Sequence, residues 1–338
     1  MAAHGVRSID RHAFVTGGSG FVGGHLIRRL VGDGWHVAAL ARSEPAVERV
    51  RSLRATPMTG SLADVAKMTA GMDGCDVVFH CAAMVGSWGD PEEFRSTNVD
   101  GTANVIAAAK AAGVRRLVHL STESVLLDGR ELDRVDETTP IPERGHLSAY
   151  AATKAEAEKL AIAASGPDLQ VMAVRPRLIW GPDDATWLPG LVEKVRRGAF
   201  RWVDGGRHLG STCHVDNVVE GMILAAENGR AGESYFLTDG SPTTFREFAT
   251  AYLATAGVAP ADSSVPGWLM RMVGAVLEAA WRALRLRSAP PLNRVEAAMV
   301  SHPMILSDAK ARAELGYRPR TGFEDGMAAL RTHGRQEG

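Results

Sequence analysis

A glycine-rich turn near the N-terminus restricts the fold of this chain more than any other feature of its sequence. The turn 16–23 follows the apolar run 13–16 and precedes a helical pattern over 21–30. In a phosphate-binding turn the first glycine permits the tight bend, and the second lets the backbone approach a pyrophosphate at the helix N-terminus. The third allows the helix to pack closely on the sheet. The sequence therefore predicts a dinucleotide site whose contacts here are Gly17, Gly20, Phe21, Val22 and Gly23.

Short apolar runs alternate with helical stretches through the first half of the chain. The predicted strands cover residues 13–16, 36–40, 55–58, 76–80, 116–121 and 170–174, and another follows at 234–238. Such alternation favours an α/β fold with a doubly wound parallel sheet. We therefore expect a cofactor-binding domain over 10–176, completed by 212–238. A smaller, mixed substrate-binding lobe is expected over 177–211 and 239–335.

Tyr150 and Lys154 lie four residues apart in the helical pattern 150–164. Residues at this spacing share one face of a helix. A tyrosine has an ordinary pKa of about 10, and a nearby ammonium group favours its phenolate. The pair therefore predicts a phenol that exchanges a proton with a substrate oxygen.

The end of the second predicted strand lacks the acid that NAD-selective sites place on the ribose hydroxyls. Ala41 and Arg42 stand there, followed by Ser43. An arginine at this position can pair with the 2′-phosphate of NADP, and the serine can donate a hydrogen bond to it. The sequence predicts NADP(H) as cofactor, with NAD(H) as the alternative.

Composition and charge argue against several classes of function. The formal net charge of −1 provides no general attraction for nucleic acid, so no nucleic-acid partner is expected. The three cysteines, Cys75, Cys81 and Cys213, have no metal-binding spacing, so no metal is expected and buried thiols in a reducing compartment are favoured. Residues 1–12 lack the apolar core of a signal peptide, and no apolar run matches a spanning helix. A cytoplasmic protein is expected.

Several motifs together resemble the extended short-chain dehydrogenase/reductase family, over roughly residues 12–330. They are TGGSGFVG, HCAAMVG, NVDGTANV, LSTESV, YAATK, RPRLIWGP and HVDN. The resemblance implies a Rossmann fold and the Tyr150–Lys154 roles in oxidoreduction. Within the family the chain is most similar to 3β-hydroxysteroid dehydrogenases and 2-alkyl-3-oxoalkanoate reductases. WGD at 88–90, RPRLIWGP and the amphipathic C-terminal third support that similarity.

The resemblance also implies roles for single residues. Thr122 falls on the catalytic hydroxyl position, with Ser121 as the fallback, and Asn98 is expected to order the active-site helix. Ser61 replaces an aspartate that often bonds the adenine. The implied cofactor contacts beyond the glycine turn are Arg42, Ser61, Leu62, Ala82, Ala83, Asn98, Tyr150, Lys154, Arg175 and Pro176.

Two substitutions distinguish this chain from the nucleotide-sugar enzymes of the family. Leu178 stands where those enzymes tend to have an asparagine, and Gly210 where they tend to have an arginine. An apolar pocket is therefore expected. Its candidate lining residues are Met84, Trp88, Trp180 and Trp187, and Arg177 or Arg207 is the candidate partner for a substrate carboxylate.

Residues 266–287 form an amphipathic helical pattern. Arg271, Glu278, Arg282 and Arg285 share one side, and the other side is apolar. Three interpretations remain open: a helix packed on the body, a lid over a hydrophobic substrate, or a patch that contacts a membrane. The resemblance further implies a homodimer through the helices 98–112 and 150–164.

These features favour an NAD(P)(H)-dependent oxidoreductase that interconverts a secondary alcohol and a ketone. The expected substrate is a bulky hydrophobic small molecule, such as a β-keto acid or a steroid. The catalytic residues are predicted to be Thr122, Tyr150 and Lys154. One alternative is a nucleotide-sugar epimerase or dehydratase. Another is a non-catalytic NADP-binding regulator.

Overall fold

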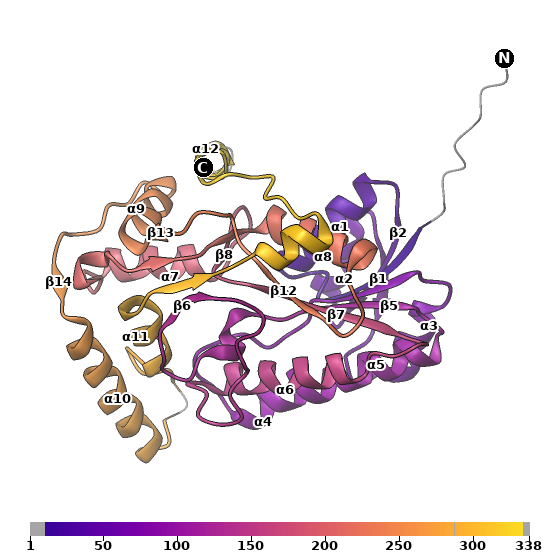
Figure 1. The fold of residues 1–338 in the computed structure, drawn as a ribbon, viewed down its shortest axis with the longest axis horizontal. Helices are drawn as coiled ribbons and strands as arrows, with labels where there is room; N and C mark the ends of the chain where they lie inside the picture. The colour runs from indigo at the N-terminus through magenta and orange to yellow at the C-terminus, as the bar shows by residue number, and fades with distance from the viewer. Residues whose placement is uncertain (1–10, 287, 334–338) are drawn as a thin grey trace.

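A parallel sheet of seven strands forms the centre of the computed structural model, which describes residues 11–286 and 288–333 (Figure 1). The strands are ordered β12-β7-β5-β4-β1-β2-β3. They are β1 (His12–Thr16), β2 (His36–Ala41), β3 (Thr56–Thr59), β4 (Val77–His80), β5 (Arg116–Leu120), β7 (Gln170–Pro176) and β12 (Ser234–Leu237). Each predicted strand of the first half has its counterpart here, and 234–238 joins the same sheet. The predicted α/β class and doubly wound parallel sheet are therefore confirmed.

Helices cover both faces of this sheet, as the parallel connections require (Figure 1). One face holds α1 (Phe21–Gly32), α2 (Glu44–Ser52) and α8 (Val215–Asn228), whose apolar side chains join those of the sheet in one core cluster. The other face holds α3 (Val65–Met72), α5 (Gly101–Ala111) and α6 (Ala149–Ala163) around a second cluster. The short helical segments α4 (Pro91–Arg95) and η1 (Ser96–Asp100) precede α5, and η2 (Glu123–Leu126) follows β5.

A smaller, mixed lobe lies beyond the carboxyl ends of the central strands. Its four-stranded sheet has the order β13-β10-β15-β6, with one antiparallel pair, and two short two-stranded sheets accompany it. The strands are β6 (Leu132–Val135), β8 (Ile179–Trp180), β9 (Trp202–Val203), β10 (Leu209–Gly210), β11 (Cys213–His214), β13 (Thr243–Thr244), β14 (Ser264–Val265) and β15 (Met304–Leu306). The helical segments are α7 (Trp187–Arg196), η3 (Asp204–Gly206), α9 (Phe245–Thr255), α10 (Gly267–Ala283), α11 (Arg294–Ser301) and α12 (Phe323–His333). The segment η4 (Ala311–Leu315) returns to the central sheet, where it packs with α8.

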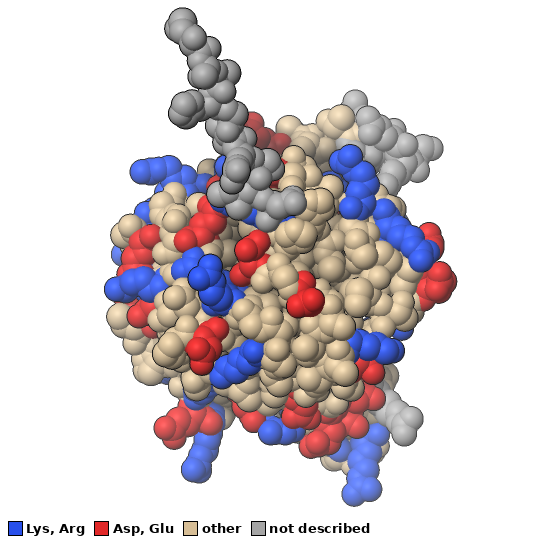
Figure 2. Space-filling model, turned by 90° about the vertical axis from the view of Figure 1, so that its right-hand side faces the viewer, with Lys and Arg blue, Asp and Glu red and all other residues tan. Residues whose placement is uncertain are grey.

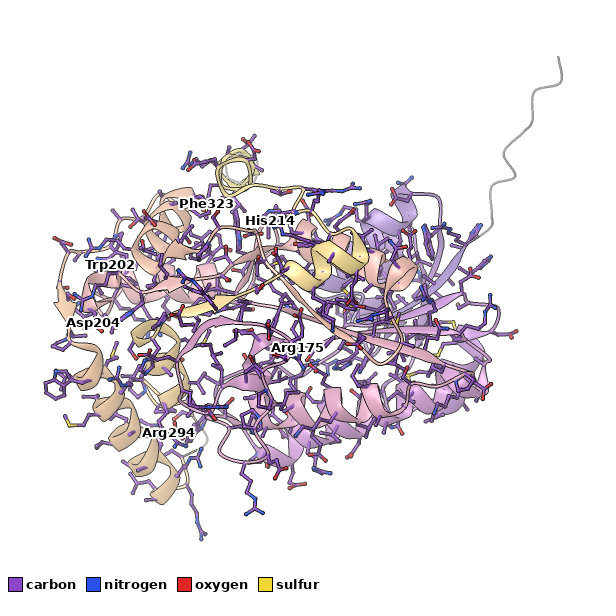
Figure 3. All side chains as sticks on the ribbon, in the orientation of Figure 1. Arg175, Trp202, Asp204, His214, Arg294 and Phe323 are labelled. Carbon is purple, nitrogen blue, oxygen red and sulfur yellow. The ribbon has the colours of Figure 1, made fainter. Side chains whose placement is uncertain are left out.

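Helix α10 packs on α11 through its polar side. Glu278 is only 4% exposed, and the backbone N–H and Nε of Arg294 donate to its carboxylate at 3.0 and 3.1 Å. A side chain at Gly274 would meet the backbone oxygen of Asn293 at 3.0 Å, so the two helices approach closely there. Figure 3 places Arg294 beside α10 at the lower left of the molecule. The amphipathic helix is confirmed over Gly267–Ala283, with the Glu278 side facing the body. Arg285, predicted on the same side, lies beyond the helix because the chain turns there with φ +51°, and position 287 lies outside the described residues.

The apolar side of α10 is divided between the interior and the surface. Leu269, Met270 and Val273 border a large cavity. Trp268 is 61% exposed and Val276 63% exposed, and they belong to a row of exposed large apolar residues. Within 11–286 and 288–333, no helix is both long and apolar enough to cross a membrane.

Candidate active site

A single cavity of about 1560 Å³ runs from the glycine turn to α10. It lies where parallel strands end and helices begin, the place where doubly wound sheets bind their ligands. The loops after β1, β2, β4, β5 and β7 border one part of it, and residues of α7, α10 and α11 border the other. The cavity therefore connects the predicted cofactor site with the smaller lobe.

The glycine turn has the geometry that a dinucleotide requires. Gly17 has φ +71°, and a side chain there would lie 2.7 Å from the backbone nitrogen of Ala82. A side chain at Gly23 would collide with the Gly17 backbone, so α1 can begin directly beneath the turn only because Gly23 is a glycine. The turn thus presents backbone and the N-terminus of α1 to the cavity. These residues fit the phosphates of a nicotinamide dinucleotide.

Most predicted cofactor contacts border this same cavity. They are Gly17, Gly20, Phe21, Val22, Gly23, Arg42, Ser61, Leu62, Ala82, Ala83, Tyr150, Lys154 and Pro176. Asn98 is buried instead, and it holds the loop after β4: it accepts from the Met84 backbone N–H at 2.8 Å and donates to the Met84 carbonyl oxygen at 3.1 Å. Its Nδ2 also donates to Thr153 of α6 at 3.1 Å, which ties that loop to the active-site helix.

Tyr150, Thr122 and Lys154 meet at the cavity wall. Ser148 caps α6 by accepting from the backbone of Ala151 at 3.1 Å, which fixes the helix turn that presents Tyr150. Burial raises the pKa of the Tyr150 phenol and the charge of Glu123 raises it further, while the side-chain hydrogen bond with Thr122 acts in the opposite direction. The phenol is therefore protonated at neutral pH.

Lys154 is buried and bonded away from the phenol. Its ammonium donates to the Leu120 carbonyl oxygen at 2.7 Å and lies 3.2 Å from Nε2 of His119. Burial lowers the pKa of Lys154 to about 8, although the nearby Glu158 favours its charged form. The expectation that Lys154 shifts the tyrosine pKa finds no counterpart among the causes that act on Tyr150 here. Instead, Glu123 is the charged group that acts on the phenol.

The buried carboxylate of Glu158 binds both Ser121 and Arg175. Ser121 donates to the Glu158 carboxylate, and Arg175 donates to the same carboxylate through Nε at 3.0 Å. Arg175 is absent from the cavity wall; it lies near the middle of the molecule in Figure 3. Ser121 reaches the wall, but its hydroxyl proton is engaged with Glu158; the Thr122 hydroxyl donates to Glu123 and also lies against Tyr150.

The predicted substrate residues separate into two groups. Trp187 borders the cavity, while Met84, Trp88, Arg177 and Trp180 do not. Trp180 is fully buried in the lobe core, where its Nε1 donates to Asp239 at 2.7 Å. It belongs to the core because it packs among aromatic rings of α9 and α12 rather than beside the cavity. The apolar residues found there instead include Leu178, Leu191, Phe245, Leu269, Val273, Val295 and Met299.

Glu123 is an acidic residue of the cavity wall that sequence reasoning did not single out. Thr122 donates to its carboxylate at 2.7 Å, and Nε of Arg177 lies 3.9 Å from the other carboxylate oxygen. Burial raises the pKa of Glu123, and the Arg177 charge opposes that shift. The available signal in the sequence was an acid directly after the predicted catalytic hydroxyl; the pairing with Arg177 depends on the fold.

The two positions that distinguish the chain from nucleotide-sugar enzymes have structural consequences. Leu178 contributes an apolar side chain to the cavity. A side chain at Gly210 would lie 2.9 Å from Nη1 of Arg177, so Arg177 occupies the space that a larger residue would need. Arg207 is exposed and absent from the cavity wall.

Comparison with known proteins agrees with this geometry. Residues 14–266 match the family model for the 3-beta hydroxysteroid dehydrogenase/isomerase family. The chain is 47% identical, over 95% of its length and 96% of the relative, to a 4-hydroxy-2-methyl-3-oxo-4-farnesyl-3,4-dihydroquinoline-1-oxide ketoreductase of Stigmatella aurantiaca. It is 37% identical, over 94% of its length and 97% of the relative, to a 2-alkyl-3-oxoalkanoate reductase of Stenotrophomonas maltophilia.

Solved structures share the whole fold. The dTDP-glucose 4,6-dehydratase DesIV of Streptomyces venezuelae, determined with NAD bound, is 26% identical with a TM-score of 0.72, over 96% of this chain and 97% of that one. The UDP-glucose 4-epimerase of Thermotoga maritima has a TM-score of 0.75 over 96% and 99% of the two chains, but at 21% identity this likeness concerns the fold alone. With the glycine turn and the cavity, these findings support a nicotinamide cofactor. The chain thus belongs to the 3-beta hydroxysteroid dehydrogenase/isomerase family and is an NAD(P)-dependent oxidoreductase that interconverts hydroxyl and keto groups.

Proposed function

We propose that this enzyme reduces a ketone on a bulky hydrophobic molecule with NADPH. One observation carries the proposal: the Tyr150 phenol opens onto a cavity whose outer part is bordered by apolar side chains of α7, α10 and α11. We assign cofactor binding to 10–176 with 212–238, and substrate binding to 177–211 and 239–335. Positions 10, 334 and 335 lie outside the described residues.

Tyr150 and Thr122 are proposed to act on the substrate oxygen. The raised pKa of Tyr150 keeps its proton in place, which suits a phenol that donates to a developing alkoxide. Thr122 is assigned to the same oxygen, which requires its hydroxyl to turn from Glu123. Ser121 is less suited because its hydroxyl donates to the buried carboxylate of Glu158, which Arg175 also binds. Lys154 borders the same cavity, with its ammonium on the Leu120 carbonyl oxygen. When bound, the nicotinamide supplies the hydride.

Arg42 supports the preference for NADPH, because it borders the cavity, as Ser61 does. The end of β2 carries Ala41 and Arg42 instead of the acid that binds the ribose hydroxyls in NAD-selective sites. Ser43 is exposed beside it at the N-cap position of α2, and its side chain makes no capping hydrogen bond there. An Arg42→Ala variant is expected to lose roughly tenfold or more in kcat/KM with NADPH and little with NADH. Equal use of both cofactors by the wild-type enzyme, unchanged in the variant, would contradict the preference.

The substrate test is NADPH oxidation with a panel of hydrophobic ketones. A long-chain 3-oxo ester, its free acid, a 3-ketosteroid and an alkyl quinolone ketone span the chemistry named for the relatives. We expect turnover on at least one hydrophobic member and none on a nucleotide sugar. Tight binding of a uridine or thymidine diphosphate sugar would instead favour epimerase chemistry, which the Gly210–Arg177 contact disfavours.

We further propose that the exposed side of α10 rests on a lipid surface. Trp268, Met272 and Val276 lie on successive turns and are each at least half exposed. The opposite side is fixed to α11 by Glu278 and by the close approach at Gly274, so the apolar side points outward in the folded protein. An amphipathic helix with an exposed tryptophan and flanking arginines fits an anionic membrane interface.

Two further features favour lipid over another occupant. Arg282 is exposed at the end of α10, and Arg285 follows it, so the polar margin is basic. The same helix borders the cavity through Leu269 and Val273, which would place the cavity wall next to a reservoir of hydrophobic substrate. Elsewhere charges of both signs are mixed on the surface, as the face in Figure 2 illustrates.

Sedimentation with phosphatidylcholine vesicles, with and without one third phosphatidylglycerol, tests this contact. We expect binding to the anionic vesicles, weakened roughly tenfold or more in a Met272→Glu, Val276→Glu double variant. Ala66→Glu, on the exposed side of α3, is the matched control. If the wild-type enzyme ignores both vesicle types, the proposal fails; self-association that the double variant abolishes would assign the surface to a second copy.

A homodimer and a cytoplasmic location also belong to the proposal. Ala107 and Ala111 of α5 are exposed, which leaves room for a second copy, whereas Ala151 and Ala155 of α6 are buried within the subunit. The three cysteines are free thiols, in keeping with a reducing compartment. Analytical ultracentrifugation of the wild-type enzyme and of Ala107→Glu tests the dimer; identical monomeric profiles would contradict it.

A further inference from the structure

Glu123 places a carboxylate beside the group that would hold the reacting oxygen. It stands at the start of η2, directly after Thr122, and borders the cavity. Thr122 donates its hydroxyl proton to Oε2 of Glu123 at 2.7 Å. The position of the reacting carbonyl, next to Tyr150 and Thr122, is therefore also next to an acid.

The hydrogen bonds of Thr122 restrict what this corner can recognise. A hydroxyl has one proton, and here that proton is engaged by Glu123. The Thr122 oxygen also accepts from the backbone N–H of Ser124 at 3.2 Å. Thr122 and Glu123 therefore offer acceptor oxygens to the cavity and no free proton. An anionic ligand group would meet acceptors and negative charge where it needs donors.

The nearby cations do not compensate for this charge on the cavity side. Arg177 lies 3.9 Å from Oε1 of Glu123, is absent from the wall of this cavity, and donates through Nη1 to the Ser211 carbonyl oxygen at 2.6 Å. Lys154 directs its ammonium to the Leu120 carbonyl oxygen and His119. Arg177 therefore holds Glu123 in place from behind rather than offering a partner to a ligand carboxylate.

We propose that Glu123 is a specificity-determining residue that selects uncharged ketones over ketones with a carboxylate next to the carbonyl. The inference rests on the proposed ketone reduction and narrows its substrate class. A β-keto acid bound for reaction brings its carboxylate within a few bonds of the carbonyl, and so close to Glu123. The neutral ester of the same acid keeps the shape and removes the repulsion.

The test compares methyl 3-oxotetradecanoate with 3-oxotetradecanoate at pH 8.5, with NADPH and the full-length enzyme. We expect the wild-type kcat/KM for the ester to exceed that for the acid by roughly tenfold or more. Glu123→Gln, which keeps the shape and removes the charge, should bring the two within about threefold, mainly by improving the acid. Glu93→Gln, an exposed acid of α4 away from the cavity, should keep the wild-type ratio.

Failure of the Glu123 selectivity can be distinguished from failure of ketone reduction. Equal or better turnover of the acid by the wild-type enzyme overturns it, and so does an unchanged ratio in Glu123→Gln. The wild-type comparison needs no variant, so it stands even if Glu123→Gln fails to fold. If neither compound turns over, ketone reduction of this type fails, and calorimetric binding of the same pair still decides the selectivity: ester tighter supports it, acid tighter overturns it.

Discussion

Buried polar groups serve different ends in two regions of this molecule. Where α10 meets α11, Glu278 receives hydrogen bonds from Arg294 on two sides and an ion pair from Arg282. At the catalytic end, Tyr150 and Glu123 border a cavity and share the single hydroxyl of Thr122. A saturated buried group fixes one structure, whereas a group that borders a cavity has bonding capacity left for a ligand. Substitutions in the two regions should therefore affect different properties.

The largest effect is expected at the catalytic end, from Tyr150→Phe. Removal of the phenol takes away the proton donor, so kcat should fall by about 10²- to 10⁴-fold, while the melting temperature changes little. Steady-state rates and thermal unfolding measure the two properties. Tyr252→Phe is the matched control, because its hydroxyl bonds Asp184 outside the catalytic group and its loss should affect stability more than rate. Near-normal turnover by Tyr150→Phe would remove the mechanism.

In the α10 region the sharpest test is Gly274→Leu. A side chain there would collide with the backbone of Asn293 and with Ala297, so we expect a loss of about 2 kcal/mol in unfolding free energy. Ala275→Leu introduces the same side chain one residue along, on the exposed side, and should cost almost nothing. Urea unfolding of both variants decides the matter. Equal losses would mean that α10 does not pack through its glycine side.

The histidines near the site give a pH dependence of stability. Burial, and secondarily the charge of Lys154, lowers the pKa of His80 to about 3, and Thr16 and Thr102 hydrogen-bond its two ring nitrogens. The unfolded chain takes up this proton near pH 6.5 and the folded protein does not. This contribution is therefore complete above pH 6.5 and is lost as the pH falls toward 3. Between pH 7 and 5 it amounts to about 2 kcal/mol, and His80→Gln should remove that part of the decline in urea unfolding.

The smallest effect is expected from Val276→Ser on the exposed side of α10. Because Val276 is already largely in water, its replacement should change the unfolding free energy by less than about 0.5 kcal/mol. The same change at the fully buried Val78 of β4 should cost several times more. A large loss at Val276 would indicate that another surface covers it in solution.

The sequence predicted the central sheet well because regularity determines it. Apolar runs such as 77–79 are buried on both faces in a parallel sheet, so they stand out without knowledge of their neighbours. The glycine turn is recognisable for a similar reason, since Gly17 has a backbone conformation and a close contact with Ala82 that favour glycine. Local requirements of this kind determine the residue type at a position, so the sequence alone reveals them.

Other features depend on contacts between distant segments. The periodicity of 266–287 identified two sides of a helix, but only the presence of α11 with Arg294 determines which side faces inward. Trp180 was predicted to border the substrate and lies in the lobe core, because α9 and α12 supply aromatic partners far along the chain. Glu123 acquired its significance only when Arg177 and Tyr150 were placed beside it. These relations are tertiary, and no local pattern encodes them.

The contact between Gly17 and Ala82 has a consequence for the order of assembly. The turn after β1 and the loop after β4 touch across more than sixty residues of intervening chain, including β2 and β3. The phosphate-binding turn is therefore backed by its neighbouring loop only after β4 has inserted beside β1. A nascent chain that has emerged as far as β3 already contains every glycine of the motif but lacks most of the cavity wall. Affinity for the dinucleotide should arise late in folding, as a property of the joined strands rather than of the motif itself.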